Sequence, residues 1–293
     1  MPEIQRGVRR QQFSEGRKVR VTTSEAATPP TRGGVILAPR SQPVTDSVLV
    51  VSIPVSPYVE VARWLLDILG IAYHEQCHAP FLHLPASFRQ RGGTDVPVLS
   101  APGVSLANAR AVLEHYGCYG PPERRLYPEA PEDRAEVERL VTLFYDDMGV
   151  AVRAWAYSHM LPEREVTARL WARGAPAFER FVVRWAYPVL AAWMRRALRI
   201  TPRTPEQAVV EIDTALDQVE VLLSDGRRYL AADRFTAADL VFAALLGPAV
   251  LPDNYGGPLP APFELPAQMR RDHERFRNRE AGAYALRLYR EDR

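Results

Sequence analysis

Residues 47–57 read Ser47-Val-Leu-Val-Val-Ser-Ile53-Pro54-Val-Ser-Pro57, a short apolar run closed by two prolines. The run is rich in β-branched side chains, which is typical of a strand buried on both faces. Pro57 suits the first turn of a helix, because the N–H that proline lacks would have no partner there. We therefore predict a buried strand over 47–53 with a helix directly after it.

The helix and a second strand follow in the pattern of the next residues. From Tyr58 to Leu69 the apolar positions recur at helical spacing, and Gly70 can end the helix. Residues 72–77 have the character of a second strand. A strand, a helix and a strand this close together predict a βαβ unit with a right-handed crossover.

The remainder of this first domain, predicted over residues 47–117, continues as strand, turn, strand and helix. The strands are expected at 95–99, which contains a proline, and at 104–106. Asn108 is placed to cap a helix that runs to Tyr116, because its side-chain oxygen can accept a first-turn N–H. The domain is thus an α/β domain of the order βαβ-ββα.

Three further regions flank or follow this domain. Residues 1–46 are basic and polar with little periodicity, so we expect a poorly ordered extension; a basic arm that touches a partner is the alternative. Residues 118–131 are rich in proline and glycine, as linkers are. Residues 132–293 have helical periodicity throughout and predict an all-helical domain.

Within the helical domain four main helices are expected. They span 132–159, 164–198 with a bend at Gly174-Ala-Pro176, about 204–223, and 236–246. Thr204 is expected to cap the third, with proline at the next position. Thr236-Ala-Ala-Asp239 is expected to start the fourth as a capping box, in which the side chain of each of the two polar residues accepts a hydrogen bond from the backbone N–H of the other.

Composition excludes several classes of function. The chain has 293 residues and a net charge of +2, so no general attraction to nucleic acid or to an anionic membrane is expected. No apolar run reaches the ~18 residues that a membrane-spanning helix needs. The two cysteines, Cys77 and Cys118, are too few for a disulfide framework, which indicates a reducing, cytoplasmic location.

Two clusters of polar residues have structural and functional interpretations. His74, Cys77, His78 and His83 lie close in sequence, but on a strand Cys77 points away from His74 and His78, so we expect no metal site. Asp146-Asp147 could act as a base or bind a basic group. A solvated or salt-bridged helix face is the favoured interpretation of that pair.

Four local motifs occur along the chain: Ser56-Pro57-Tyr58-Val59, Val96-Pro97-Val98-Leu99, Leu106-Ala-Asn-Ala-Arg-Ala-Val112 and Tyr229-Leu-Ala-Ala-Asp-Arg-Phe-Thr-Ala-Ala-Asp-Leu240. In this order they resemble the cytosolic glutathione transferase superfamily. The resemblance covers nearly all of residues 47–290. It implies a thioredoxin-like α/β N-terminal domain followed by an all-α helical bundle. The last motif matches most specifically, and its role is structural, because the Thr236–Asp239 box sets a buried helix start.

The resemblance implies that Ser56 contacts the sulfur of glutathione and that Tyr58 belongs to the glutathione site. A helix N-terminus carries partial positive charge and a hydroxyl can donate to a thiolate, so both favour the ionised thiol. The alternative is that Ser56 only caps the helix. The lack of a cysteine at this turn argues against disulfide chemistry.

The resemblance also implies that Pro97 is cis and that the backbone of Val96 holds the cysteinyl part of glutathione. An ordinary trans proline at an edge is the alternative, since proline is normally excluded from a central strand. Asn108 and Ala109 stand where the family has the Glu-Ser pair that binds the γ-glutamyl end. Loss of the charged and the neutral bond would weaken binding by about 2–4 kcal/mol.

Two functions follow as expectations. The first is a glutathione transferase-like enzyme with glutathione as co-substrate, which transfers the thiolate to an electrophilic, apolar small molecule. The second is a binding or scaffold protein of the same fold that has lost glutathione recognition, as the Asn108-Ala109 departure suggests. Both are expected to form a two-fold homodimer, to need no metal, and to have no nucleic-acid or membrane partner.

Overall fold

The computed structural model describes residues 48–293, so the predicted N-terminal extension lies outside the described residues. The first domain is built on a four-stranded mixed sheet of order β2-β1-β3-β4. Its strands are β1 Leu49–Ser52, β2 His74–Cys77, β3 Val98–Ala101 and β4 Val104–Leu106. β1 pairs in parallel with β2 and antiparallel with β3, which pairs antiparallel with β4. This is the thioredoxin-like arrangement that the βαβ-ββα pattern predicts.

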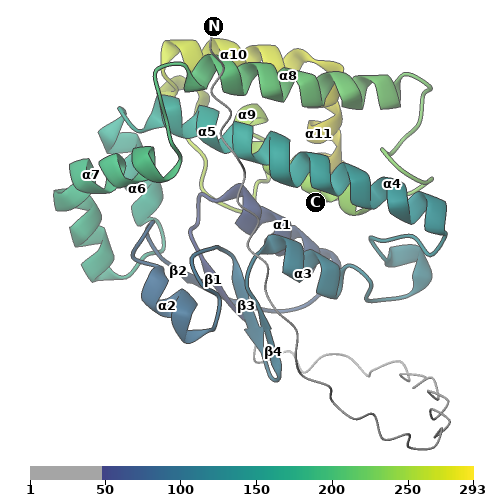
Figure 1. The fold of residues 1–293 in the computed structure, drawn as a ribbon, viewed down its shortest axis with the longest axis horizontal. Coiled ribbons are helices and arrows are strands. Elements are labelled where there is room, and N and C mark those ends of the chain that lie inside the picture. Colours follow the sequence, from purple (N-terminus) through teal and green to yellow (C-terminus); the bar gives the residue numbers. More distant parts are fainter. Residues whose placement is uncertain (1–47) are drawn as a thin grey trace, which may run out of the picture. The chain divides into compact units, whose positions relative to one another are not determined.

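Three helices belong to the sheet: α1 Pro57–Ile68, α2 Leu84–Arg89 and α3 Ala109–Tyr116. Every residue of α1 from Pro57 to Leu66 is buried. The reason is that α1 contacts α3 and also α9 (Ala237–Val250) of the helical domain, so it is covered by both domains (Figure 1). The turn at residues 54–56 therefore leads into α1 at the point where the two domains meet.

The helical domain starts with one long rod that holds a local change of pitch. α4 Pro131–Thr142 and α5 Gly149–Met160 are joined by a π-helical segment, Leu143–Met148 (Figure 1). The other helices are α6 Arg164–Ala172, α7 Ala177–Ala197, α8 Thr204–Leu223, α10 Ala267–Asn278 and α11 Glu280–Glu291. Short 3₁₀ turns occupy Pro122–Arg124 and Pro262–Glu264.

The buried centre of the helical domain is α9, which the predicted capping box opens. The Asp239 carboxylate accepts hydrogen bonds from the Thr236 amide (2.7 Å), the Thr236 hydroxyl (2.8 Å) and the Leu230 amide (2.8 Å), and also from the Tyr284 hydroxyl. Burial raises the pKa of Asp239 above its ordinary value, and these four donors oppose that effect. The capping box is therefore confirmed, and it ties α9 to the loop before it and to α11.

Three expectations about element boundaries are wrong. Thr204 does not cap α8, because Arg203 occupies that position and the Thr204 hydroxyl accepts from the Thr201 amide instead (2.8 Å). Residues 164–198 form two helices, since Gly174 adopts a positive φ of 72° between α6 and α7. Pro97 precedes β3 and so takes no ladder position within it.

Candidate functional site

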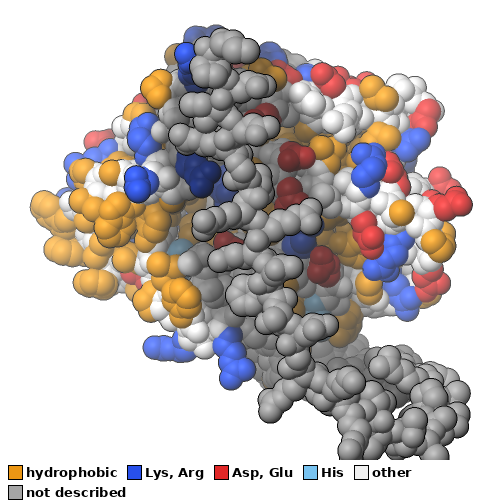
Figure 2. Space-filling view, in the orientation of Figure 1, with side chains coloured by type: hydrophobic (Ala, Val, Ile, Leu, Met, Phe, Trp, Pro, Cys, Tyr) orange, Lys and Arg blue, Asp and Glu red, His pale blue; other side chains and the backbone are white. Residues whose placement is uncertain are grey.

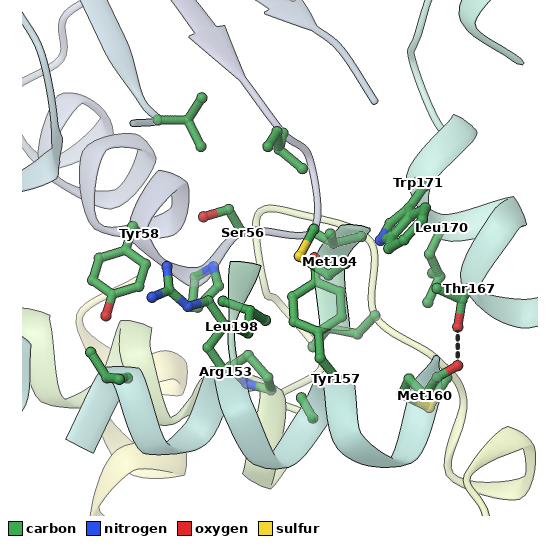
Figure 3. A pocket seen from close by; sticks show the side chains of 18 of the residues that line it. Ser56, Tyr58, Arg153, Tyr157, Met160, Thr167, Leu170, Trp171, Met194 and Leu198 are labelled. Carbon is green, nitrogen blue, oxygen red and sulfur yellow. Dashed lines mark hydrogen bonds between the residues drawn. The ribbon is translucent and has the colours of Figure 1, made fainter. Parts of the chain in front are cut away.

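A cavity of about 390 Å³ opens between the start of α1 and the helical domain (Figure 3). This volume lies in the range of small-molecule sites. One wall comes from the turn before α1 and from residues 94–96, and the facing wall from α5, α6 and α7. The apolar side chains that line it include Val55, Tyr157, Met160, Leu170, Trp171, Met194, Leu198, Leu259 and Met269.

Ser56 lies at the turn that carries the chain from β1 into α1. Its amide donates to the Ile53 carbonyl (2.9 Å), and its carbonyl accepts from the Val59 amide (3.0 Å). The backbone of the turn is thus held from both sides. The Ser56 hydroxyl makes no capping hydrogen bond to α1. Because the side chain lines the cavity, its hydroxyl is free to bind a ligand there.

The Val96–Pro97 peptide bond is cis, as the resemblance implies. Val96 lines the same cavity as Ser56, and Pro97 is buried directly behind it. Ser56 and Val96 are therefore brought together from two segments that are 40 positions apart in the chain. Asp95, whose side chain is exposed, lines the cavity beside them and can pair with a cationic group of a ligand.

Tyr58 is buried at the edge of the cavity and contacts the helical domain. Its hydroxyl donates to the Tyr145 carbonyl (3.1 Å), and the two rings meet edge to face at 4.9 Å between centroids. Burial raises the pKa of the Tyr58 hydroxyl above its ordinary value. Tyr58 therefore stays protonated at neutral pH, and its one hydroxyl proton is committed to the Tyr145 carbonyl.

Arg153, on α5, is a site residue that the sequence interpretation missed. Its guanidinium carbon lies 5.3 Å from the centroid of the Tyr58 ring, and Figure 3 shows the side chain rising from α5 toward Tyr58 and Ser56. Its Nε is buried and has no hydrogen-bond partner among the described residues. One signal was available: Arg153 is the only arginine, lysine or acidic residue in α5.

The remaining acidic residue of the cavity rim is already paired. Asp146, in the π-helical segment, forms an ion pair with Arg110 of α3 (2.8 Å). Arg110 also lies over the Tyr145 ring, 4.7 Å from its centroid. The favoured interpretation of Asp146 as part of a salt-bridged face is confirmed. The free cation of Arg153 and the paired carboxylate of Asp146 leave the α5 side of the cavity suited to an anion.

Asn108 and Ala109 are not among the lining residues of the cavity. The Asn108 side-chain oxygen accepts from the Ala111 amide (2.9 Å) and so caps α3 as predicted. Ala109 is completely buried. The γ-glutamyl positions of the family are thus occupied here by a helix cap and a core methyl group.

The histidine cluster after β2 has structural partners. His78 Nδ1 lies 2.5 Å from a Glu179 carboxylate oxygen, and His83 Nε2 lies 3.1 Å from the Thr94 carbonyl. Over residues 48–293, no group of three His, Cys, Asp or Glu side chains is placed to hold a metal ion. Burial raises the pKa of the Cys77 thiol, which keeps it from acting as a thiolate nucleophile.

Comparison with known proteins agrees with this architecture. Residues 50–117 match the family model "Glutathione S-transferase, N-terminal domain", and residues 206–289 match "Glutathione S-transferase, C-terminal domain". The chain belongs to the glutathione S-transferase superfamily, with a thioredoxin-like domain followed by an all-helical domain. No curated protein gives a significant match over its sequence.

Solved structures share the fold at low identity. A possible glutathione S-transferase from Rhodopseudomonas palustris is 16% identical with a TM-score of 0.52, over 84% of this chain and 94% of that one. A glutathione S-transferase from Xanthobacter autotrophicus Py2 is 16% identical with a TM-score of 0.50, over 84% and 93%. One from Methylobacillus flagellatus, solved with glutathione bound, is 17% identical over 82% and 98%, with a TM-score of 0.49.

Proposed function

We propose that this chain is a glutathione transferase-like enzyme that joins a glutathione thiolate to an electrophilic, largely apolar substrate. The observation that supports this most is the single cavity that combines the free hydroxyl of Ser56, the backbone of Val96 and the cation of Arg153 with an apolar wall. A polar thiol-binding side and an apolar side within one cavity are what the reaction requires.

In this proposal the sulfur of glutathione lies at the turn before α1. Its S–H gives a proton to solvent, and the Ser56 hydroxyl donates a hydrogen bond to the resulting thiolate. The α1 N-terminus and the nearby Arg153 guanidinium favour the same charge. The thiolate attacks an electrophilic carbon, a carbon–sulfur bond forms, and the leaving group departs with the electron pair. Positioning by Val96 and by the apolar wall supplies proximity.

The test is turnover of a generic aryl halide with glutathione. Ser56→Ala is expected to lower kcat/KM by about 10- to 150-fold, because a hydrogen bond to a charged group is worth about 1.5–3 kcal/mol. It should also move the acid limb of the pH–rate profile to higher pH, since the bound thiol loses a donor to its ionised form. Ser224→Ala, at the exposed end of α8, is the matched control and should change neither quantity. Wild-type protein without turnover would refute the enzymatic function.

The second candidate is a binding protein of this fold without glutathione chemistry. It is favoured by one observation: Asn108 uses its oxygen as a cap and Ala109 has no hydroxyl, so neither holds a γ-glutamyl group in the cavity. Thermal shift with a panel of thiols separates the two, because a ligand that binds only the folded state raises the melting point. Stabilisation by glutathione would support the enzyme, and stabilisation only by apolar thiol-free ligands would support the binding protein.

A two-fold homodimer belongs to the same proposal, by analogy with the family. Light scattering in solution is the direct measurement, and a mass of one chain across the working range of concentrations would contradict it.

A further inference from the structure

The outward face of α7 is a second feature that the enzymatic proposal does not use. Five large apolar side chains on this helix are at least half exposed. They are Phe178 (71%), Phe181 (61%), Trp185 (66%), Val189 (50%) and Trp193 (54%). Four aromatic rings exposed to this degree leave roughly several hundred square ångströms of apolar surface open to solvent. Figure 2 shows hydrophobic side chains gathered over α6 and α7.

The five side chains form one stripe. At about 100° per residue they fall within an arc of about 120° around the helix axis. Val183, Tyr187 and Leu190, which are buried against the protein, lie on the opposite side. A surface helix needs only one apolar face to pack on its own domain. A second apolar face, such as this one, therefore indicates binding to another apolar surface.

The exposed charges on α7 and on the residues directly flanking it are of one sign. Residues 173–203 contain seven arginines and a single acidic residue, Glu179. Glu179 is buried, where its carboxylate meets the His78 ring (2.5 Å) and the Ala79 amide (2.8 Å). Arg184 and Arg195 are exposed along one edge of the stripe and Arg196 is exposed at its C-terminal end, and α7 has no exposed carboxylate to balance them.

We propose that this face of α7 docks on the surface of an anionic lipid membrane, with the helix lying in the plane of the interface. Phenylalanine and tryptophan on one face with arginines at its border is the pattern of interfacial helices. The aromatic rings would enter the headgroup region and the arginines would meet lipid phosphates. Within residues 48–293 no helix is both long and apolar enough to cross a bilayer, so the contact is one of surface.

A second copy of the chain is a poorer partner for the same face. A two-fold contact through α7 would bring the arginines of both copies together, with no exposed acid on either helix to pair with them. An anionic surface instead complements both the charge and the apolar stripe. The face is also held rigidly, because Glu179 ties the start of α7 to the loop after β2 and Phe81 meets the Trp193 ring at 5.8 Å.

The neighbouring α2 presents the same chemistry. Phe88 is 59% exposed, and Arg89 and Arg91 beside it are exposed as well. Both α6 and α7 lie in residues 118–205, between the two segments that match the family models. The α7 stripe is thus formed by a part of the chain that those models do not describe, whereas α2 lies within the matched residues 50–117.

The first test is sedimentation of the full chain with vesicles of phosphatidylcholine, alone or with about one-third phosphatidylglycerol. We expect binding to the mixed vesicles, little binding to the neutral ones, and loss of binding as salt rises, since salt screens the arginines. The double variant F181E/W185E should bind at least about tenfold more weakly. Phe263→Glu, at an equally exposed aromatic residue outside α7, is the matched control and should bind as wild type.

The second test uses the tryptophans. Trp64, Trp155 and Trp171 are buried, so a blue shift of emission on vesicle binding would come from Trp185 and Trp193. W185F/W193F should abolish the shift while the protein still sediments with anionic vesicles. Equal binding to neutral and anionic vesicles, or full binding by F181E/W185E, would overturn the proposal. So would loss of a dimer in F181E/W185E with no vesicle binding by wild type, which would make the face a protein interface.

Discussion

The helices α1 and α9 both start at a residue with a hydroxyl side chain, but the two hydroxyl groups differ in their hydrogen bonding. At α9 the Thr236 hydroxyl and amide are both engaged by Asp239, and the site is fully buried. At α1 the backbone of Ser56 is held, but its hydroxyl caps nothing and lines a cavity. A helix start whose bonds are all made inside the protein maintains the fold. One that leaves a donor free at a cavity is available to a ligand.

Two other helix starts extend the comparison. α3 is capped by Asn108, the residue directly before it. The first turn of α11 is instead hydrogen-bonded by a residue of another helix, Glu220 of α8, whose carboxylate accepts from the Ala281 amide (3.4 Å) and from Arg279 (2.7 Å). Among these four starts, Ser56 alone faces the cavity with its side chain uncommitted. The expected effects of substitution therefore differ in kind, and we order them by size.

The largest effect should come from Asp239→Ala. The substitution leaves the buried amides of Leu230 and Thr236 and the Tyr284 hydroxyl without an acceptor, at about 1–3 kcal/mol for each group. We expect the free energy of unfolding to fall by about 3–5 kcal/mol in urea denaturation. Asp253→Ala, at an exposed position, is the control and should keep the wild-type midpoint. If Asp239→Ala and Asp253→Ala unfold at the same urea concentration, the hydrogen bonds at the start of α9 do not maintain the fold, and the contrast with α1 fails.

A smaller effect sharpens the comparison directly. Thr236→Ala should lower the free energy of unfolding by about 1–2 kcal/mol, because the buried hydrogen bond from its hydroxyl to the Asp239 carboxylate is lost. Ser56→Ala should leave it within about 0.5 kcal/mol, since the hydroxyl makes no capping bond to lose. The measurement is the urea midpoint of the two variants side by side. A loss of stability in Ser56→Ala as large as that in Thr236→Ala would show that Ser56 serves the fold.

The cap of α3 is expected to be worth about 1 kcal/mol. Asn108→Ala removes the acceptor of the Ala111 amide and should lower the thermal midpoint accordingly. Asn108→Asp keeps an acceptor and adds a charge that the helix N-terminus favours, so it should retain wild-type stability. If both variants melt alike, the cap does not contribute.

The smallest effect concerns α11 and depends on pH. The Arg279 hydrogen bonds hold the pKa of Glu220 below its ordinary value of 4.5. The folded state thus favours the ionised form of Glu220. The stability that its interaction with Arg279 contributes is complete above a pH of 4.5 and is lost as the pH falls through the lower pKa of the folded state. Glu220→Gln should cost less than about 1 kcal/mol at neutral pH. Its difference from wild type should shrink as the pH is lowered below the ordinary glutamate pKa. A difference that stays constant with pH would exclude the carboxylate charge as its cause.

Sequence predicted the parts of this molecule that depend on neighbours in the chain. β1, α1, the Asn108 cap and the Thr236–Asp239 box all follow from local residue order. The failures also have local causes. Thr204 bonds back to Thr201 instead of capping α8, and the positive φ of Gly174 divides one expected helix into two.

The cavity was only half predictable. Ser56 and Val96 come from motifs, whereas Arg153 lies on α5 and reaches Tyr58 only because the two domains pack together. The docking face of α7 was not predicted from the sequence, for a related reason. A net charge of +2 over the whole chain conceals seven arginines around one helix, and only burial shows which aromatic side chains face outward.

The π-helical segment between α4 and α5 has a consequence for the geometry of the cavity. Wider turns advance the register, so residues after Met148 are rotated relative to the positions they would hold in a continuous α-helix. Tyr145 and Asp146 from within the segment, and Val150, Arg153 and Tyr157 beyond it, all line the cavity as a result. A chain one residue shorter here would turn the arginine away from Ser56 by about a quarter of a revolution. The position of the Arg153 charge in the cavity is thus set by the winding of the helix before it.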